Sequence, residues 1–137
     1  MSMPVTLEQS VSVPLHRRAV AKLAVGAARG LVRLPPRRLR SALELINRGA
    51  RPATAAQALS ARQAIVAAST RCAGLRCLDR SVAVALLCRA HGAWPQWCTG
   101  IRTDPFRAHA WIEVESIAVG EADDMKLYCK TMVVPPR

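Results

Sequence analysis

The stretch that decides the fold is CLDRSVAVALLC, residues Cys77–Cys88. After its first turn this stretch is apolar on nearly every side, and Gly92 closes it shortly afterwards. A helix that is apolar all round lies in the interior of a protein, because it has no polar face to offer to water. The sequence therefore predicts a central, buried helix that begins at Cys77 and ends near His91.

Downstream of this helix the pattern changes to that of strands. Short apolar runs bounded by turn residues predict strands over Gln96–Arg102, Phe106–Glu115 and Ile117–Glu121, with a fourth candidate over Lys126–Val134. Helices that come first and strands that follow favour an α+β fold with an antiparallel sheet. We therefore expect the buried helix to pack on that sheet.

Upstream of the buried helix the sequence predicts further helices. Apolar residues at helical spacing, with cations on the remaining arc, indicate an amphipathic basic helix that ends at Pro35 and Pro36. Thr54 is a good N-cap for a later helix. The elements expected in this part are an edge strand or ordered arm (1–15), three helices (16–34, 37–47 and 55–72) and a short break that is the one candidate linker (49–52).

The 137 residues suffice for one core, so we expect a single domain over residues 1–137.

The positive charge is concentrated in the first half of the chain. The basic helical region, residues 1–70, carries 11 basic and 2 acidic groups. Residues 71–137, with the buried helix and the sheet, carry 9 basic and 7 acidic groups. This asymmetry suggests an anionic partner, which could be an acidic peptide or protein, a membrane surface or nucleic acid.

Cysteine usage bears on the cellular compartment. An odd number of cysteines without a C-x-x-C pair predicts neither a disulfide framework nor a thiolate zinc site. The first apolar stretch is interrupted by Lys22, Arg29 and Arg33, so we expect no signal peptide and no membrane-spanning segment. The expected location is a reducing bacterial cytoplasm. The cysteines are Cys72, Cys77, Cys88, Cys98 and Cys129.

Cys77 is the candidate nucleophile. It stands at the start of the buried helix, where unpaired N–H groups and the helix dipole favour a thiolate. A nucleophilic cysteine also needs a base. His16 lies in the basic helix and His91 lies about 20 Å of helical rise from Cys77, so neither reaches it. His109, in the strand that follows, is therefore the candidate base.

A carboxylate would orient the imidazole of His109. If the strands on either side of Glu115 form a hairpin centred on that residue, Glu121 lies directly opposite His109, within reach of its Nδ1. Asp123 is then the diagonal neighbour on the same face. A two-residue turn at Glu115 and Ser116 would instead place Ala122 opposite His109. Glu121 is the preferred orienting residue, and Asp123 is the alternative.

Several segments together resemble the transglutaminase-like cysteine protease of lasso-peptide biosynthesis, in its short, free-standing form. The resemblance covers nearly the whole chain and is most specific in its second half. It is carried by RCAGLRCLDRS (71–81), by Gly92-x-x-Pro95, by Gly100 and Ile101, by PFRAHAWIEV (105–114), and by LPPRRLR (34–40) and RGARPAT (48–54).

The resemblance implies a papain-like fold and a Cys-His-acid triad, with Cys77 as the nucleophile and His109 as the base. The third member in that family is usually an aspartate, and Glu121 stands at the matching position. The implied activity is cleavage of the leader peptide from a ribosomally made lasso precursor, without a cofactor. The implied partners are the precursor peptide, a separate small leader-recognition protein and an asparagine-synthetase-like cyclase.

Three alternatives to a leader peptidase can be read from the sequence, namely a binding module, a transamidase and a metal site. The basic helices would suit a binding module, but they lack aromatic residues for stacking on bases, so we do not expect nucleic-acid binding. A transamidase could use the same triad if an amine replaced water. Cys88 and His91 have helical spacing for two metal ligands, which is too few for a site, and no metal is expected.

Overall fold

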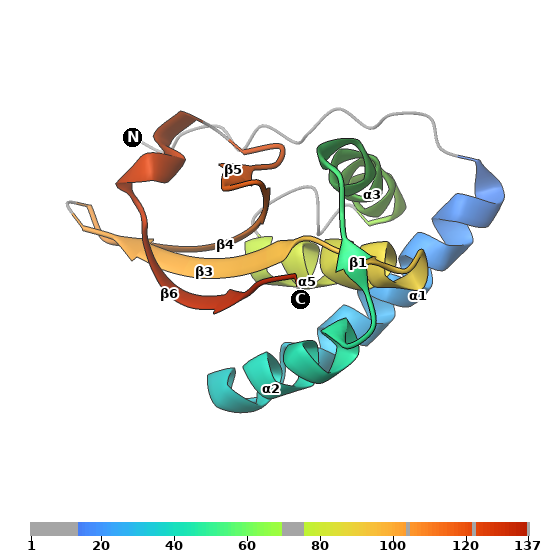
Figure 1. The fold of residues 1–137 in the computed structure, drawn as a ribbon, viewed down its shortest axis with the longest axis horizontal. Helices are drawn as coiled ribbons and strands as arrows, with labels where there is room; N and C mark the ends of the chain where they lie inside the picture. The colour runs from blue at the N-terminus through green and yellow to red at the C-terminus, as the bar shows by residue number, and fades with distance from the viewer. Residues whose placement is uncertain (1–13, 70–75, 104, 122, 137) are drawn as a thin grey trace.

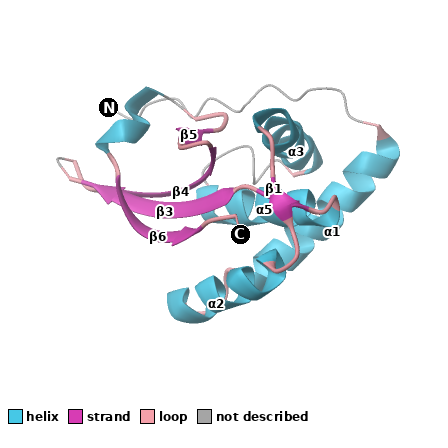
Figure 2. Cartoon of the chain, in the orientation of Figure 1, coloured by secondary structure: helices cyan, strands magenta, loops and turns pink. Residues whose placement is uncertain are grey.

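The computed structural model describes residues 14–69, 76–103, 105–121 and 123–136. Its core element is helix α5 (Cys77–Ala90), which packs against the sheet, while α1 (Leu15–Leu31) and α3 (Ala55–Ala68) pack against other sides of α5 (Figures 1 and 2). The structure thus confirms the predicted α+β fold with a buried, cysteine-bearing helix on an antiparallel sheet.

The four-stranded sheet has the order β5-β4-β3-β6, and all neighbouring strands are antiparallel. Strands β3 (Gln96–Arg102) and β4 (Arg107–Val114) form its centre, flanked by β5 (Ile117–Ala118) and β6 (Cys129–Val134). Residue 109 of β4 pairs with residue 100 of β3. The predicted strand over 96–102 is confirmed, whereas the last strand begins at Cys129, after a 3-10 helix η1 (Asp123–Leu127).

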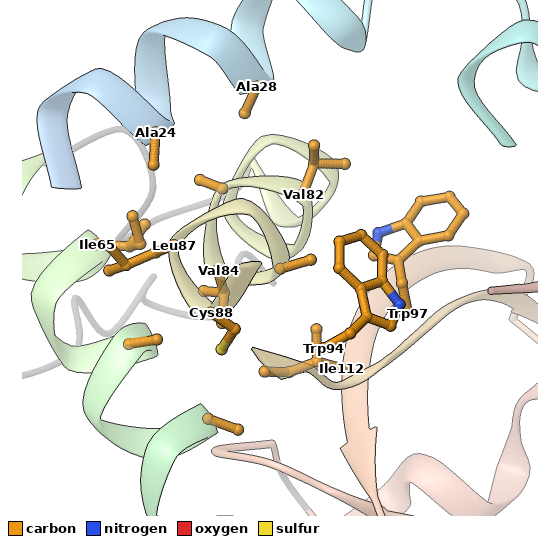
Figure 3. Packing of buried hydrophobic residues seen from close by; sticks show 14 of the residues in the cluster. Ala24, Ala28, Ile65, Val82, Val84, Leu87, Cys88, Trp94, Trp97 and Ile112 are labelled. Carbon is orange, nitrogen blue, oxygen red and sulfur yellow. The ribbon is translucent and has the colours of Figure 1, made fainter. Parts of the chain in front are cut away.

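Small residues on α5 let the neighbouring elements approach it closely. Val82, Ala83, Val84 and Ala85 are all buried, as the all-round apolar pattern predicts. Figure 3 shows Ala24 and Ala28 of α1 and Ile65 of α3 around this helix, and Trp97 and Ile112 on the side of the sheet. The core is therefore continuous from the helices to the sheet.

Two buried tryptophans tie this core together through their indole N–H groups. Trp97 Nε1 donates to Ser81 Oγ of α5 at 3.1 Å, and Trp94 Nε1 donates to the carbonyl oxygen of Val134 in β6 at 3.1 Å. A buried indole N–H needs such a partner. The first bond fixes β3 relative to the first turns of α5, where Cys77 lies, and the second joins β6 to the segment just before β3.

The helix boundaries follow the capping residues. Helix α1 ends at Leu31 rather than at residue 34, and a tighter turn, in which Leu34 N–H donates to the carbonyl oxygen of Leu31, leads to Pro35. Helix α2 (Pro36–Asn47) begins with a proline, which suits the first turn. Helix α3 opens with a capping box, in which Thr54 and Gln57 exchange side-chain and backbone hydrogen bonds.

Some of the remaining predictions were wrong, and others lie outside the described residues. The candidate linker over 49–52 contains a two-residue strand, β1 (Arg51–Pro52), which pairs in parallel with β2 (Ala93–Trp94). The expected strand or arm over 1–15 lies almost entirely within residues 1–13, which the structure does not describe. The end of the helix expected over 55–72 also lies outside the described residues, at 70–72. Helix α3 itself ends at Ala68. In the part of the chain that is described, no helix combines the length and hydrophobicity needed to cross a membrane.

Candidate active site

Cys77 is the first residue of α5, and its half-buried thiol faces strand β4. The Cys77 side chain is hydrogen-bonded to the side chain of His109, and the backbone N–H of Ala110 donates to its sulfur. The first N–H groups of a helix have no partner within it, and the helix dipole favours negative charge at this end. The start of α5 is thus suited to hold a thiolate.

His109 lies on β4 between Cys77 and Glu121. Its Nε2 donates to Glu121 Oε2 at 3.2 Å, which leaves Nδ1 as the ring nitrogen for Cys77. The imidazole also stacks on the ring of Trp111, with 5.9 Å between centroids and an interplanar angle of 14°. Trp111 is itself fixed by a hydrogen bond from Nε1 to Glu113 Oε1 at 3.1 Å. The ring of His109 therefore has a defined orientation.

The electrostatics of the pair favour the charged forms of both side chains. Burial alone raises the pKa of the Cys77 thiol, but the hydrogen bonds from His109 and Ala110 and the positive charges of His109 and Arg80 lower it below its ordinary value. Burial alone lowers the pKa of His109, whereas hydrogen bonds and negative charge from Cys77 and Glu121 raise it to about 9. Each side chain therefore stabilises the charged form of the other, as a thiolate–imidazolium pair requires.

The structure brings Glu121 to His109, but not by the predicted register. Strands β4 and β5 pair Glu113 with Ala118 and Val114 with Ile117, so the turn is the two-residue alternative and not one centred on Glu115. Both turn residues have positive φ, 53° and 66°, as a tight hairpin requires. The expectation that strand pairing places Glu121 opposite His109 was therefore wrong.

Glu121 follows a bend after β5. Strand β5 ends at Ala118, well before the predicted Glu121, and Gly120 follows with a φ of +68°. Glu121 reaches His109 from this irregular segment and contacts Nε2, not the predicted Nδ1. Asp123, the alternative, begins η1, and its side chain lies outside what the structure describes.

A small cleft of about 220 Å³ opens beside Cys77 and His109. Its floor at Gly100 requires glycine, because a Cβ atom there would lie 2.7 Å from the carbonyl oxygen of Cys129 and 2.8 Å from Cη2 of Trp111. The hydroxyls of Thr99 and Thr131 are hydrogen-bonded at 3.0 Å. The cleft is lined by Cys77, Leu78, Thr99, Gly100, Ile101, Ala108, His109, Ala110 and Thr131.

Comparison with known proteins agrees with this geometry. Residues 21–134 match the sequence profile of the family described as Transglutaminase-like superfamily. The chain belongs to this superfamily. Searches of curated proteins and of solved structures found no match. Membership of the transglutaminase-like superfamily points to cysteine-peptidase or transamidase chemistry and fits a Cys, a His and a carboxylate in contact.

Sequence reasoning missed two residues that the transglutaminase-like site contains. Arg62 Nη1 of α3 lies 3.7 Å and Arg80 Nη2 of α5 lies 3.9 Å from Glu121 Oε1. The position of Arg80, three residues after Cys77 on a helix, could have suggested it. Arg62 gave no such signal, because its role depends on how α3 packs against a distant segment.

The other residues considered as site candidates lie elsewhere. His91 caps the far end of α5, and with Cys88 it lines a separate pocket of about 440 Å³. Burial raises the pKa of Cys88 to about 12 and, with a contribution from the Glu113 charge, that of Cys98 to about 11. Among the described side chains, no three His, Cys, Asp or Glu residues are grouped as a metal site would require.

Proposed function

We propose that this chain is a cysteine peptidase that removes the leader peptide from a lasso-peptide precursor. The observation that carries the peptidase chemistry is the connected set of Cys77, His109 and Glu121 at the start of a buried helix. Membership of the transglutaminase-like superfamily supports the reaction type. The choice of substrate is supported by the sequence motifs around Cys77 and His109, which resemble those of lasso leader peptidases.

The proposed reaction begins with attack of the Cys77 thiolate on the carbonyl carbon of the last leader residue. Backbone N–H groups in the first turn of α5 stabilise the oxyanion that forms. The His109 imidazolium then gives its proton to the departing core amine, the C–N bond breaks, and the leader remains attached as a thioester.

Hydrolysis of the thioester completes the cycle. Neutral His109 takes a proton from water, the resulting hydroxide attacks the thioester carbonyl, and the leader leaves as a carboxylic acid while the Cys77 thiolate is restored. Glu121 stabilises the imidazolium in both halves of the reaction through its contact with Nε2. No cofactor is needed for these steps.

The partners in this proposal are the precursor, a separate small leader-recognition protein and a lasso cyclase of the asparagine-synthetase type, which would consume the freed core amine. Holding the leader beside the site would raise the effective concentration of the scissile bond. The 20 basic against 9 acidic residues suit an acidic peptide or protein partner.

The test is to mix the protein with candidate precursor peptides, with and without a leader-recognition protein, and to follow peptide masses. We expect cleavage at the leader–core junction and a large acceleration by the recognition protein. Full activity without any partner would contradict the partner dependence. Release of ammonia with formation of an isopeptide, in place of hydrolysis, would instead identify a transamidase.

A further inference from the structure

The Glu121 carboxylate is held from two sides. Its Oε2 accepts a hydrogen bond from His109 Nε2 at 3.2 Å, while its Oε1 faces two guanidinium groups, Arg62 Nη1 at 3.7 Å and Arg80 Nη2 at 3.9 Å. The side chains of Glu121, Arg62 and Arg80 are only 9%, 7% and 8% exposed. These charges therefore interact with little screening by water.

Arg62 also fixes the backbone that carries Glu121. Its side chain lies across Gly120, so closely that a Cβ atom at position 120 would overlap its Nε and Cδ atoms. Gly120, which directly precedes Glu121, has a φ of +68°, a conformation that favours glycine. Arg62 thus contacts both Gly120 and the carboxylate, although it lies on α3, far from the triad in sequence.

Arg80 connects the same carboxylate to the nucleophile. It lies three residues after Cys77 on α5, on the same side of the helix, and its charge contributes to the lowered pKa of the Cys77 thiol. The two arginines therefore differ in function. Arg62 affects the site through Glu121 and Gly120, whereas Arg80 also acts on Cys77 directly.

We propose that Arg62 and Arg80 are positioning residues, which hold Glu121 by its Oε1 so that its Oε2 orients His109 toward Cys77. This inference rests on the proposed function in one respect, namely that Cys77 is the nucleophile. A glutamate has one more rotatable bond than the aspartate usual in similar enzymes, and the two guanidinium groups remove that freedom. They also compensate a buried negative charge that would otherwise be costly.

The test measures the rate at which iodoacetamide alkylates Cys77 as a function of pH, followed by mass spectrometry of the peptide that contains it. This rate follows the thiolate fraction and needs no knowledge of the substrate. We expect Arg62→Gln to lower the rate near neutral pH by about tenfold, which corresponds to a one-unit rise in the midpoint of the profile. Arg62→Lys, which keeps the charge, should recover part of the loss.

Double variants separate the two arginines. If Arg62 acts through Glu121, then Arg62→Gln combined with Glu121→Gln should react no more slowly than Glu121→Gln alone. Arg80→Gln combined with Glu121→Gln should still be slower than Glu121→Gln, because the direct effect on Cys77 is also lost. Arg40→Gln is the matched control, since it breaks the exposed Arg40–Glu44 pair on α2 and should leave the profile unchanged.

The inference is overturned if folded Arg62→Gln, or Arg62→Lys should the first variant fail to fold, shows the profile of the unmodified protein. It is also overturned if the double variant loses as much alkylation rate as the separate losses of Arg62→Gln and Glu121→Gln combined. Failure of the proposed function would look different. In that case the alkylation rate of Cys77 would keep its dependence on pH and on Arg62, while no lasso precursor would be cleaved.

Discussion

Helix α5 carries a cysteine in its first turn and another in its last. The surroundings of Cys77 favour a negative charge on a half-buried thiol, whereas those of Cys88 oppose it on a buried one. Cys77 lies at the end where unpaired N–H groups attract negative charge, beside His109, and its pKa is lowered. Cys88 lies near the end where carbonyl groups repel negative charge, and burial raises its pKa to about 12. One helix thus places one thiol where ionisation is favoured and another where ionisation is opposed.

The two ends of α5 also differ in the size of the pocket beside each cysteine. The pocket at the Cys88 end measures about 440 Å³ and the cleft at the Cys77 end about 220 Å³. Each is lined by a cysteine and a histidine. Among the described residues, the side chains of the cysteine and the histidine are hydrogen-bonded to each other, and linked to a buried carboxylate, only at the smaller one, so the interactions between side chains distinguish the two ends.

The largest expected effect separates the two cysteines in catalysis. Cys77→Ala and His109→Ala should each reduce leader removal on the order of 10⁴-fold or more, because each removes a member of a unit whose contributions are not additive. Cys88→Ala should retain its rate. The measurement is precursor cleavage followed by mass spectrometry, with circular dichroism to show that each variant is folded.

The double variant adds a further test of the same comparison. Cys77→Ala combined with His109→Ala should be no slower than either single variant. Near-normal turnover by Cys77→Ala, in protein free of contaminating protease, would move the chemistry away from this end of α5.

The next effect concerns Glu121, the carboxylate that contacts His109. Glu121→Gln should lower kcat by about 10²- to 10⁴-fold, because an amide can favour the wrong imidazole tautomer and does not stabilise imidazolium. Asp123→Asn should change kcat by only a few-fold, because Glu121 already occupies Nε2 of His109. The reverse ranking would mean that Asp123 supplies the acid in solution.

A smaller effect is expected in the pH profile of kcat/KM. Activity should rise as the Cys77 thiol loses its proton, at a pH below the ordinary thiol value, and fall as His109 loses its proton near pH 9. Glu121 raises the pKa of His109, so Glu121→Gln should move the basic limb to lower pH. A basic limb that stays in place in Glu121→Gln would show that the carboxylate does not interact with the imidazole during turnover.

Local patterns were sufficient to predict the elements that carry the candidate nucleophile and the candidate base. Helix α5 begins at Cys77, as predicted. The prediction succeeded because the apolar run after Cys77 and the closing Gly92 are both local features of the sequence. Strand β3 has the predicted bounds, and β4 begins only one residue late. The two-residue strands β1 and β2 were missed, because two residues are too few to show an alternating pattern.

The acid and its supports depend on interactions that no local pattern encodes. The hairpin register that predicts Glu121 is wrong by one residue, and Glu121 meets His109 from an irregular segment that follows Gly120. Arg62 is an arginine within an alanine-rich helix, and its contact with Glu121 joins residues 59 positions apart, the difference between 121 and 62. Such a contact follows from the packing of α3 against the segment after β5.

The smallest predicted effect tests whether the Cys88 end is purely structural. Cys88 belongs to the buried core between α5 and its neighbours, so Cys88→Ala removes packing contacts and should lower the free energy of unfolding by about 1 kcal/mol. Cys88→Ser should cost more, about 1–3 kcal/mol, because it places a hydroxyl in an apolar site. Urea unfolding measures both values, and precursor cleavage by the folded variants should match that of the unmodified protein. A loss of turnover in folded Cys88→Ala would mean that the two ends of α5 are coupled, since packing around Cys88 would then influence the position of Cys77.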